Sequence, residues 1–284
     1  MRGVVMVGRT MVEQESLRGV LNPAAVPAKF QLVRHAPAPD LAYFVQHYWL
    51  VAWDLRGQPP HCSETLPFPC VNIVAEPGKT LVHGVISGRY TRRLEGAGCA
   101  FGITFRPGGF RELLGAPLHT IVDAALDSGA LFGSDGVALA AGLAATDDAG
   151  TRIACAEQFL RAHAPAPDVN ADLVNAIVAA ALAERTIRRV SDLATDFGCS
   201  QRTLQRLFRE YVGLGPKWMV QRFRLQEAAE LLARPDAPPW PVLAAELGYF
   251  DQAHFINEFK AVIGRTPSAY VQGLDQRREV QQHV

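Results

Sequence analysis

The segment VSDLATDFGCSQRTLQRLF, residues 190–208, returns in modified form as PVLAAELGYFDQAHFINEF, residues 241–259. The first halves match at an offset of 50 residues, and after one inserted residue the second halves match at 51. The matched pairs are Leu193/Leu243, Ala194/Ala244, Gly198/Gly248, Leu204/Phe255, Phe208/Phe259, Gly213/Gly264 and Pro216/Pro267. Each copy predicts a helix, a turn at a glycine and a second helix that ends at another glycine, where left-handed backbone favours that residue. Two tandem helix-turn-helix units are therefore expected.

The second helix of the first copy has two opposed faces when residues are placed 100° apart. Leu204, Leu207, Phe208 and Tyr211 form an apolar face that should be buried. The opposite face and the helix start carry the predicted DNA contacts Ser200, Gln201, Arg202, Gln205, Arg206 and Arg209. Arginine can pair with guanine or neutralise phosphate, and glutamine suits adenine.

The second helix of the second copy has the same division. Phe255, Phe259 and Val262 form its apolar face. The predicted DNA contacts on the other side are Gln252, Ala253, His254, Asn257 and Lys260, with Ile256 at their border. Asparagine suits adenine, an exposed isoleucine suits a thymine methyl group and lysine suits phosphate.

Positive charge is concentrated around the first copy. The whole chain of 284 residues has a net charge of zero, but residues 185–224 contain nine Lys or Arg against three acids, a net charge of +6. A solvated basic helix is the plain alternative to a DNA contact. Two tandem copies with matching faces favour DNA.

Residues 168–270 resemble the DNA-binding domain of the AraC/XylS transcriptional regulators. The resemblance rests on the GY at 248–249, on Phe255 and Phe259, and on GRTPSAY at 264–270. It implies seven helices, with two helix-turn-helix units joined by a long helix over GPKWMVQRFRLQEAAELLAR, residues 215–234. It also implies base-facing positions at Arg202, Gln205, Arg206, Gln252, Ala253 and Asn257. The second recognition helix departs from the first in carrying Asp251 and little positive charge.

Residues 30–105 are rich in short apolar runs bounded by Pro and Gly, at intervals of about ten residues, which predicts a β-barrel or sandwich. This part resembles, more loosely, the cupin-like sensor domains of one branch of these regulators. A barrel of this size holds one small ligand or fills its interior with side chains. The aromatic residues Tyr43, Phe44, Tyr48, Trp49 and Trp53 are expected to be mostly core, with one or two lining a ligand cavity.

The expected fold class is α+β, with a cupin-like β-barrel sensor domain followed by an all-α domain with two helix-turn-helix motifs. Two prolines in PAPD, residues 165–168, prevent helix continuation and mark the domain boundary. The expected segments are a poorly ordered leader (1–28), a β-rich effector or dimerisation domain (29–133), a helical linker (134–167), an AraC-type DNA-binding domain (168–272) and a C-terminal tail (273–284). The linker would serve as a dimer interface or as a relay between the domains.

No catalytic or metal-binding signature emerges from the sequence. His61, Cys62, Cys70 and His83 lack the spacing of a zinc site, and no nucleophile elbow or phosphate-binding loop is present. No metal, no cofactor and no enzyme activity are therefore expected. Cys199 is expected to fill a turn position of the motif, and Arg106 to form a salt bridge that fixes a Pro-Gly turn.

The expected function is that of a bacterial transcriptional regulator. Five cysteines at irregular spacing, no signal peptide and no apolar run of about 20 residues favour a cytoplasmic protein with reduced thiols and no membrane partner. The expected partners are double-stranded promoter or operator DNA, a small-molecule effector, RNA polymerase if the protein is an activator, and a second copy in a homodimer. The alternatives are a cupin-type enzyme or ligand-binding protein with a tethering helical domain, and an interaction module without DNA binding.

Overall fold

The computed structural model describes residues 6–7, 10–11, 18–23, 29–183, 189–234 and 236–282. The strands are β1 (Met6–Val7), β2 (Thr10–Met11), β3 (Gln31–His35), β4 (Val45–Asp54), β5 (His61–Thr65), β6 (Asn72–Glu76), β7 (Lys79–His83), β8 (Tyr90–Leu94), β9 (Ala97–Phe105) and β10 (Ala125–Asp127). The helices are α2 (Arg111–Leu114), the 3-10 turn η3 (Leu118–Ile121), α3 (Ser128–Ala144), α4 (Ala149–Ala162), α5 (Val169–Ala183), α6 (Val190–Asp196), α7 (Gln201–Tyr211), α8 (Pro216–Leu232), α9 (Trp240–Glu246), α10 (Gln252–Ile263) and α11 (Pro267–Gln282). We call residues 29–162 the sheet half and residues 168–282 the helical half.

The sheet half is built on six antiparallel strands in the order β10-β7-β6-β9-β4-β3. The long strands β4 and β9 form its centre, where Trp49 faces Gly102 and Trp53 faces Gly98 across the ladder. A Cβ atom on Gly102 would lie 1.9 Å from the indole Cε2 of Trp49. Glycine is therefore required there, because the indole ring lies directly on the backbone.

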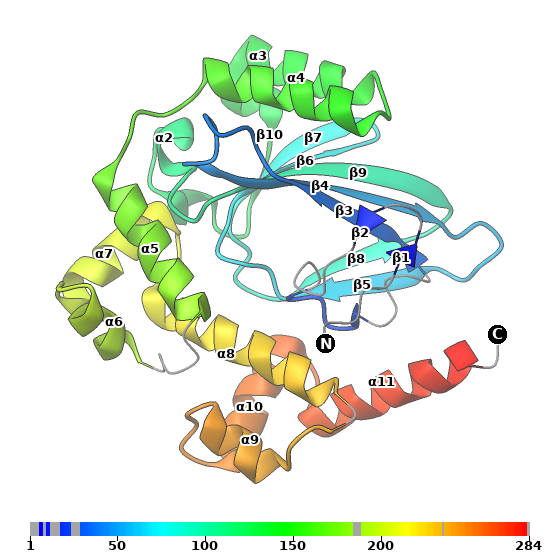
Figure 1. Cartoon of the computed structure of the whole chain (residues 1–284), viewed down its shortest axis with the longest axis vertical. Helices are drawn as coiled ribbons and strands as arrows, with labels where there is room; N and C mark the ends of the chain where they lie inside the picture. Colours follow the sequence, from blue (N-terminus) through cyan, green and yellow to red (C-terminus); the bar gives the residue numbers. More distant parts are fainter. Residues whose placement is uncertain are drawn as a thin grey trace.

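The predicted barrel is not confirmed, because the described strands leave the sheet open. Its two edges are β3 and the three-residue β10, after which the chain turns into α3. β5 and β8 form a separate antiparallel pair. Figure 1 shows α3 and α4 along one face of the large sheet and the β5–β8 pair on its other side. An ion pair of 2.8 Å between Arg92 of β8 and Glu76 of β6 connects the two sheets.

The two helices expected as a linker pack on the sheet instead. Leu139 and Leu143 of α3 and Phe159 and Leu160 of α4 belong to the same buried cluster as the sheet residue Phe101. Their burial against the strands makes α3 and α4 a layer of the sheet half. The helical half begins after them, where Asp168 caps α5 by accepting a hydrogen bond of 2.8 Å from the Asn170 backbone N–H.

The helical half has two buried clusters, one for each helix-turn-helix unit. The first gathers α5, α6, α7 and part of α8, and the second gathers the rest of α8 with α9, α10 and α11. The predicted central helix is confirmed as α8, which contributes Met219 and Phe223 to the first cluster and Leu225 and Leu232 to the second. Figure 1 shows α8 running from one unit to the other. A single helix therefore connects the two units.

The central helix is also anchored to the sheet half. The buried Arg222 donates through Nη2 to the backbone carbonyl of Ser87. The indole Nε1 of Trp218 donates to the same carbonyl at 3.0 Å, and Gln226 Nε2 donates to the Leu66 carbonyl at 2.7 Å. These contacts join loops of the sheet half to the middle of α8.

Part of the expected leader contacts the helical half. Leu21 is 1% exposed, and its carbonyl accepts a hydrogen bond of 2.5 Å from the hydroxyl of Tyr270. The backbone N–H of Leu66 donates to the Gly19 carbonyl at 2.7 Å. Residues 18–23 are thus packed, whereas residues 1–5, 8–9, 12–17 and 24–28 lie outside the described residues. At the other end, α11 continues through Gln282 into the segment expected as a tail.

No helix in the described part of the chain is long and apolar enough to cross a membrane.

Candidate nucleic-acid interface

The recognition helix of the first unit, α7, has the two faces that its sequence predicts. Ser200 caps its start, because its Oγ accepts a hydrogen bond of 3.0 Å from the Thr203 backbone N–H. The apolar residues Leu204, Leu207, Phe208 and Tyr211 are buried. The predicted contact residues Ser200, Gln201, Arg202, Gln205, Arg206 and Arg209 are all exposed. The burial of one face turns the three arginines and Gln205 to solvent.

The second recognition helix, α10, is capped by Asp251, whose Oδ1 accepts a hydrogen bond of 2.7 Å from the His254 backbone N–H. The buried residues of this helix are Phe255, Phe259 and Ile263. The exposed predicted contacts are Ala253, His254, Asn257 and Lys260, while Gln252 is half-buried. Ile256 is half-buried against the second cluster, so its side chain is less available to a thymine methyl group than its sequence position implied.

The turn before α10 contains an exposed aromatic residue that sequence reasoning did not single out. Phe250 lies between Gly248 and the cap Asp251 and is 93% exposed. The first unit has no counterpart, because Ser200 caps α7 two residues after Gly198. The change of offset from 50 to 51 between the two copies was the signal of this insertion.

Two of the arginines counted in the basic segment point inward. Arg222 is buried against the sheet half. The guanidinium of Arg224 lies 4.7 Å from the centre of the Tyr249 ring, and the Tyr249 hydroxyl donates to Glu258 at 2.6 Å. The net charge of the segment therefore overstates the positive charge at the surface. Arg185 and Arg188, which were part of the same count, lie outside the described residues.

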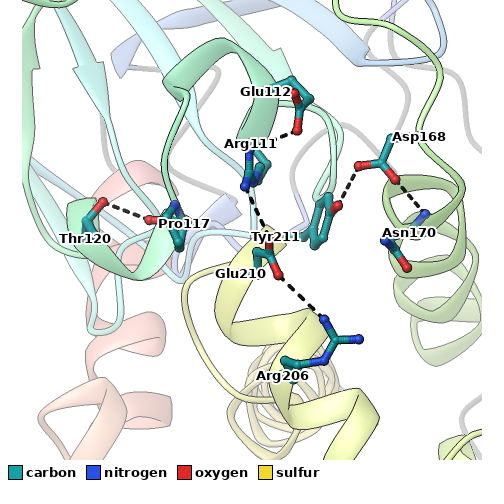
Figure 2. A network of polar contacts seen from close by, with 9 residues as sticks. All are labelled: Arg111, Glu112, Pro117, Thr120, Asp168, Asn170, Arg206, Glu210 and Tyr211. Carbon is teal, nitrogen blue, oxygen red and sulfur yellow. Dashed lines mark hydrogen bonds and ion pairs between the residues drawn. The ribbon is translucent and has the colours of Figure 1, made fainter.

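The C-terminal end of α7 is tied to its surroundings by polar contacts, drawn in Figure 2. The Tyr211 hydroxyl donates to Asp168 at 2.5 Å. Burial, together with this bond, raises the pKa of Tyr211 to about 12, so the hydroxyl keeps its proton and remains a donor at neutral pH. The neighbouring Glu210 contacts Arg111 of the sheet half and Arg206 of its own helix.

The two remaining expectations for single residues have different outcomes. Cys199 is half-buried against the first cluster, and its backbone N–H donates to the Ala194 carbonyl at 2.9 Å, as a turn residue should. Burial raises its thiol pKa, which does not favour a reactive thiolate. Arg106 fixes its turn through a hydrogen bond of 2.6 Å from Nε to the Ala42 carbonyl. Among the described residues, no acid forms the expected salt bridge with it.

The aromatic residues of the sheet half divide between core and surface. Phe44 and Tyr48 are buried, Trp49 and Trp53 are half-buried, and Tyr43 is 41% exposed. Within the described part of the chain, no group of three or more His, Cys, Asp or Glu side chains could hold a metal ion. All five cysteines are free thiols: Cys62, Cys70, Cys99, Cys155 and Cys199.

Two families match different parts of this chain. Residues 193–273 match a helix-turn-helix domain, and residues 33–127 match a domain of unknown function (DUF6597). The helix-turn-helix match begins within α6 and ends within α11, so it spans both units described above.

Curated relatives match about a third of this chain. An uncharacterized HTH-type transcriptional regulator, YidL of Escherichia coli, is 38% identical over 87 residues, which are 31% of this chain and 29% of the relative. The HTH-type transcriptional regulator ExsA of Pseudomonas aeruginosa is 30% identical over 90 residues, 32% of each chain. The chain thus spans about a third of the length of the curated relatives it matches.

A crystal structure of a transcriptional regulator from Chromobacterium violaceum, described as having an AraC-type DNA-binding domain, aligns with 37% of this chain and 94% of its own length. Its sequence identity is 24% and its TM-score 0.34. The helix-turn-helix match falls on the segment that carries the tandem units on α8. The helical half of this chain is therefore a double helix-turn-helix domain, with its tandem units carried on α8 and matched by the helix-turn-helix family over residues 193–273.

Proposed function

We propose that this chain is a sequence-specific DNA-binding transcriptional regulator of the bacterial cytoplasm. Its two recognition helices, α7 and α10, enter successive major-groove segments of one operator, about one helical turn of DNA apart. Phosphate contacts position the protein, and a few base contacts from the exposed faces supply specificity.

The observation that carries this proposal is the presence of two capped helices, each with one exposed face, on one buried frame. Each recognition helix buries its apolar face and exposes the residues that suit DNA. α8 joins both units and is buried along most of its length. A basic surface helix alone would not need a second copy held at a fixed orientation.

The sheet half is proposed as the regulatory part, responding to a small molecule or mediating dimerisation. Its support is its position: loops at Leu66 and Ser87 hydrogen-bond to the central helix that carries both units. A change in these loops would reach α8 directly. If the chain activates transcription, RNA polymerase is a further partner.

A selection from random duplex DNA with the purified full chain tests the proposed function. We expect one enriched sequence family with two half-sites, bound at moderate salt in the presence of excess unrelated DNA. The log–log dependence of affinity on salt should be linear, with a slope of about −0.9 for each phosphate neutralised. No enriched sequence, or binding that unrelated DNA competes away equally, would refute the proposal.

A charge-matched pair of triple variants separates recognition from general electrostatics. Replacing Arg202, Arg206 and Arg209 by Ala should abolish specific binding and flatten the salt dependence. Replacing Arg56, Arg93 and Arg161 by Ala removes the same charge from exposed arginines of the sheet half, each of which pairs with an acid. This control should retain the selected sequence preference.

A further inference from the structure

An acidic residue lies on the first recognition helix, one turn after Arg206. Glu210 Oε2 lies 3.9 Å from Arg206 Nη1, an i to i+4 ion pair, and the Arg206 side chain is 65% exposed. Such a carboxylate opposes DNA binding in two ways, because it repels phosphate and competes for the Arg206 guanidinium. The first recognition helix thus contains its own competitor for DNA.

A cation from the sheet half lies beside the same carboxylate. Arg111 Nη2 is 3.3 Å from the other carboxylate oxygen of Glu210, Oε1, and Arg111 Nη1 is 2.9 Å from Glu112. Arg111 is the first residue of α2, far from Glu210 in sequence. Figure 2 shows Glu210 between the two arginines, which approach it from different elements.

The two arginines differ in how firmly they hold Glu210. Arg111 is closer to the carboxylate and is 24% exposed, against 65% for Arg206. An ion pair that is less exposed to solvent is less screened by salt and water. Glu210 therefore pairs mainly with Arg111, and its ion pair with Arg206 is weaker and more exposed.

The end of α7 packs against the sheet half through contacts that do not involve the ion pair. These contacts keep Arg111 close to Glu210. The turn after α7 presses on η3 of the sheet half: a Cβ on Gly213 would lie 2.9 Å from the Leu118 carbonyl and 2.7 Å from Val122 Cγ2. Tyr211 fixes the same end of α7 to Asp168. The position of Glu210 relative to α2 is therefore set by backbone contacts and not by the ion pair alone.

We propose that Arg111 is a positioning residue for DNA recognition. By pairing with Glu210, it keeps the carboxylate away from Arg206 and leaves the Arg206 guanidinium available to DNA. A movement of the sheet half that withdraws Arg111 returns Glu210 to Arg206 and weakens binding. This inference rests on the proposed function, and it names a route by which the sheet half acts on the first recognition helix.

A double-mutant cycle on the selected operator tests the pairing. Arg111→Ala should weaken binding about two- to fivefold, the effect expected of a partly exposed ion pair. Glu210→Gln should bind as tightly as the wild type or more tightly. In the Glu210→Gln background, Arg111→Ala should have no further effect. In the Arg206→Ala background its effect should be smaller than in the wild type, because only the repulsion between Glu210 and phosphate remains.

Two further variants separate positioning from other roles of Arg111. Arg111→Lys retains the charge and should recover part of the affinity. Arg161→Ala is the control, because Arg161 lies on α4 and its Nε pairs with Asp40 Oδ2 at 2.7 Å. This variant should leave operator binding unchanged. Thermal unfolding of each variant shows whether the fold is retained.

The outcomes are distinguishable. If Arg111→Ala costs the same in all three backgrounds, Arg111 contacts DNA itself or acts only on folding, and the positioning role is overturned. If Arg111→Ala leaves wild-type affinity unchanged, the inference fails while the proposed function stands. A wild-type chain that selects no operator would overturn the proposed function and this inference together.

Discussion

Arg206 and Asn257 occupy corresponding places in the two recognition helices, and both are exposed. Arg206 offers DNA a charged, forked donor, whereas Asn257 offers a neutral amide on a helix whose cap is the acidic Asp251. We expect Arg206→Ala to weaken operator binding by about 1–3 kcal/mol, and Asn257→Ala to weaken it less. Gel-shift titrations of both variants on one operator measure the difference; equal losses, or the reverse order, would contradict the asymmetry between the two units.

His47 on β4 predicts a pH dependence of stability. Burial, and then the charge of Arg34, lowers its pKa from 6.5 to about 4. Because the folded chain binds this proton less readily than the unfolded chain, protonation favours unfolding. The His47 contribution is complete above pH 6.5 and is lost as pH falls toward 4, on the order of 3 kcal/mol at about 1.4 kcal/mol per pKa unit.

Urea unfolding at pH 7.5 and at pH 4.5 measures this loss. In His47→Gln, the difference in unfolding free energy between the two pH values should be smaller than in the wild type. The remaining carboxylates titrate in both proteins, so the comparison isolates His47. An equal difference in both proteins would show that His47 is accessible to protons in the folded state.

Individual contact residues on α7 could be predicted because helical periodicity fixes which side chains share a face. The exposed set around Arg206 and the buried set around Phe208 are as the pattern indicated. Arg222 could not be assigned from its charge, since its burial depends on Ser87, more than 130 residues away. Ile256 lies at the border between the two faces of α10, where a small rotation of the helix decides exposure.

At the scale of elements, the two glycine turns of the first unit make different demands. Gly198 has φ +59° and open space where a Cβ would stand, whereas Gly213 has φ +91° and close neighbours in η3. Gly198→Ala should cost about 1–2 kcal/mol, the penalty of left-handed backbone. Gly213→Ala should cost more, about 3 kcal/mol, because overpacking adds to the backbone penalty.

Chemical denaturation of the two variants measures both costs under one set of conditions. Gly198→Ala is the matched control, since it changes the same atom in the same backbone region without a neighbour. Equal losses would show that η3 moves aside freely and that the contact between α7 and the sheet half yields easily. In that case the packing argument for the position of Glu210 would also weaken.

Helices were easier to predict than the sheet for a physical reason. A helix satisfies its own backbone, so caps such as Ser200 and glycines such as Gly213 mark its ends within the local sequence. A strand has its partners elsewhere in the chain. The pattern of short apolar runs predicted strands, but it could not show that β10 would stop after three residues and leave an edge, or that α3 and α4 would cover one face.

At the scale of the whole molecule, the two halves are connected along the length of the helical half. Arg111 meets Glu210 at the first unit, Ser87 meets Arg222 at the central helix, and Glu64 meets Arg265 beside the second unit, at 2.6 Å. The domain boundary predicted at residues 165–168 gave no indication of these contacts, because they join residues far apart in the sequence. Both units therefore take their orientation from α8 and from the sheet half together.

The buried Arg222 provides the test of this connection. Its guanidinium lies 4.8 Å from the centre of the Trp218 ring and donates to the Ser87 and Gly88 carbonyls. Burial lowers its pKa to about 10, so the side chain is still charged at neutral pH and depends on these partners. Arg222→Ala would remove the donor, leave a cavity beside Trp218 and cost about 3 kcal/mol.

Calorimetry distinguishes a local loss from a loss of coupling between the halves. The wild type should unfold in one transition, because the sheet half and the helical half share the α8 contacts. Arg222→Ala should separate it into two transitions, with the helical half unfolding first, since its central helix loses a buried polar anchor to the sheet half. Arg234→Ala, at an exposed position just after α8, is the control and should leave one transition at an unchanged midpoint. A single transition in Arg222→Ala at the wild-type midpoint would contradict this role of Arg222. The remaining contacts between the two halves, at Gln226 and Arg265, would then be sufficient to couple them.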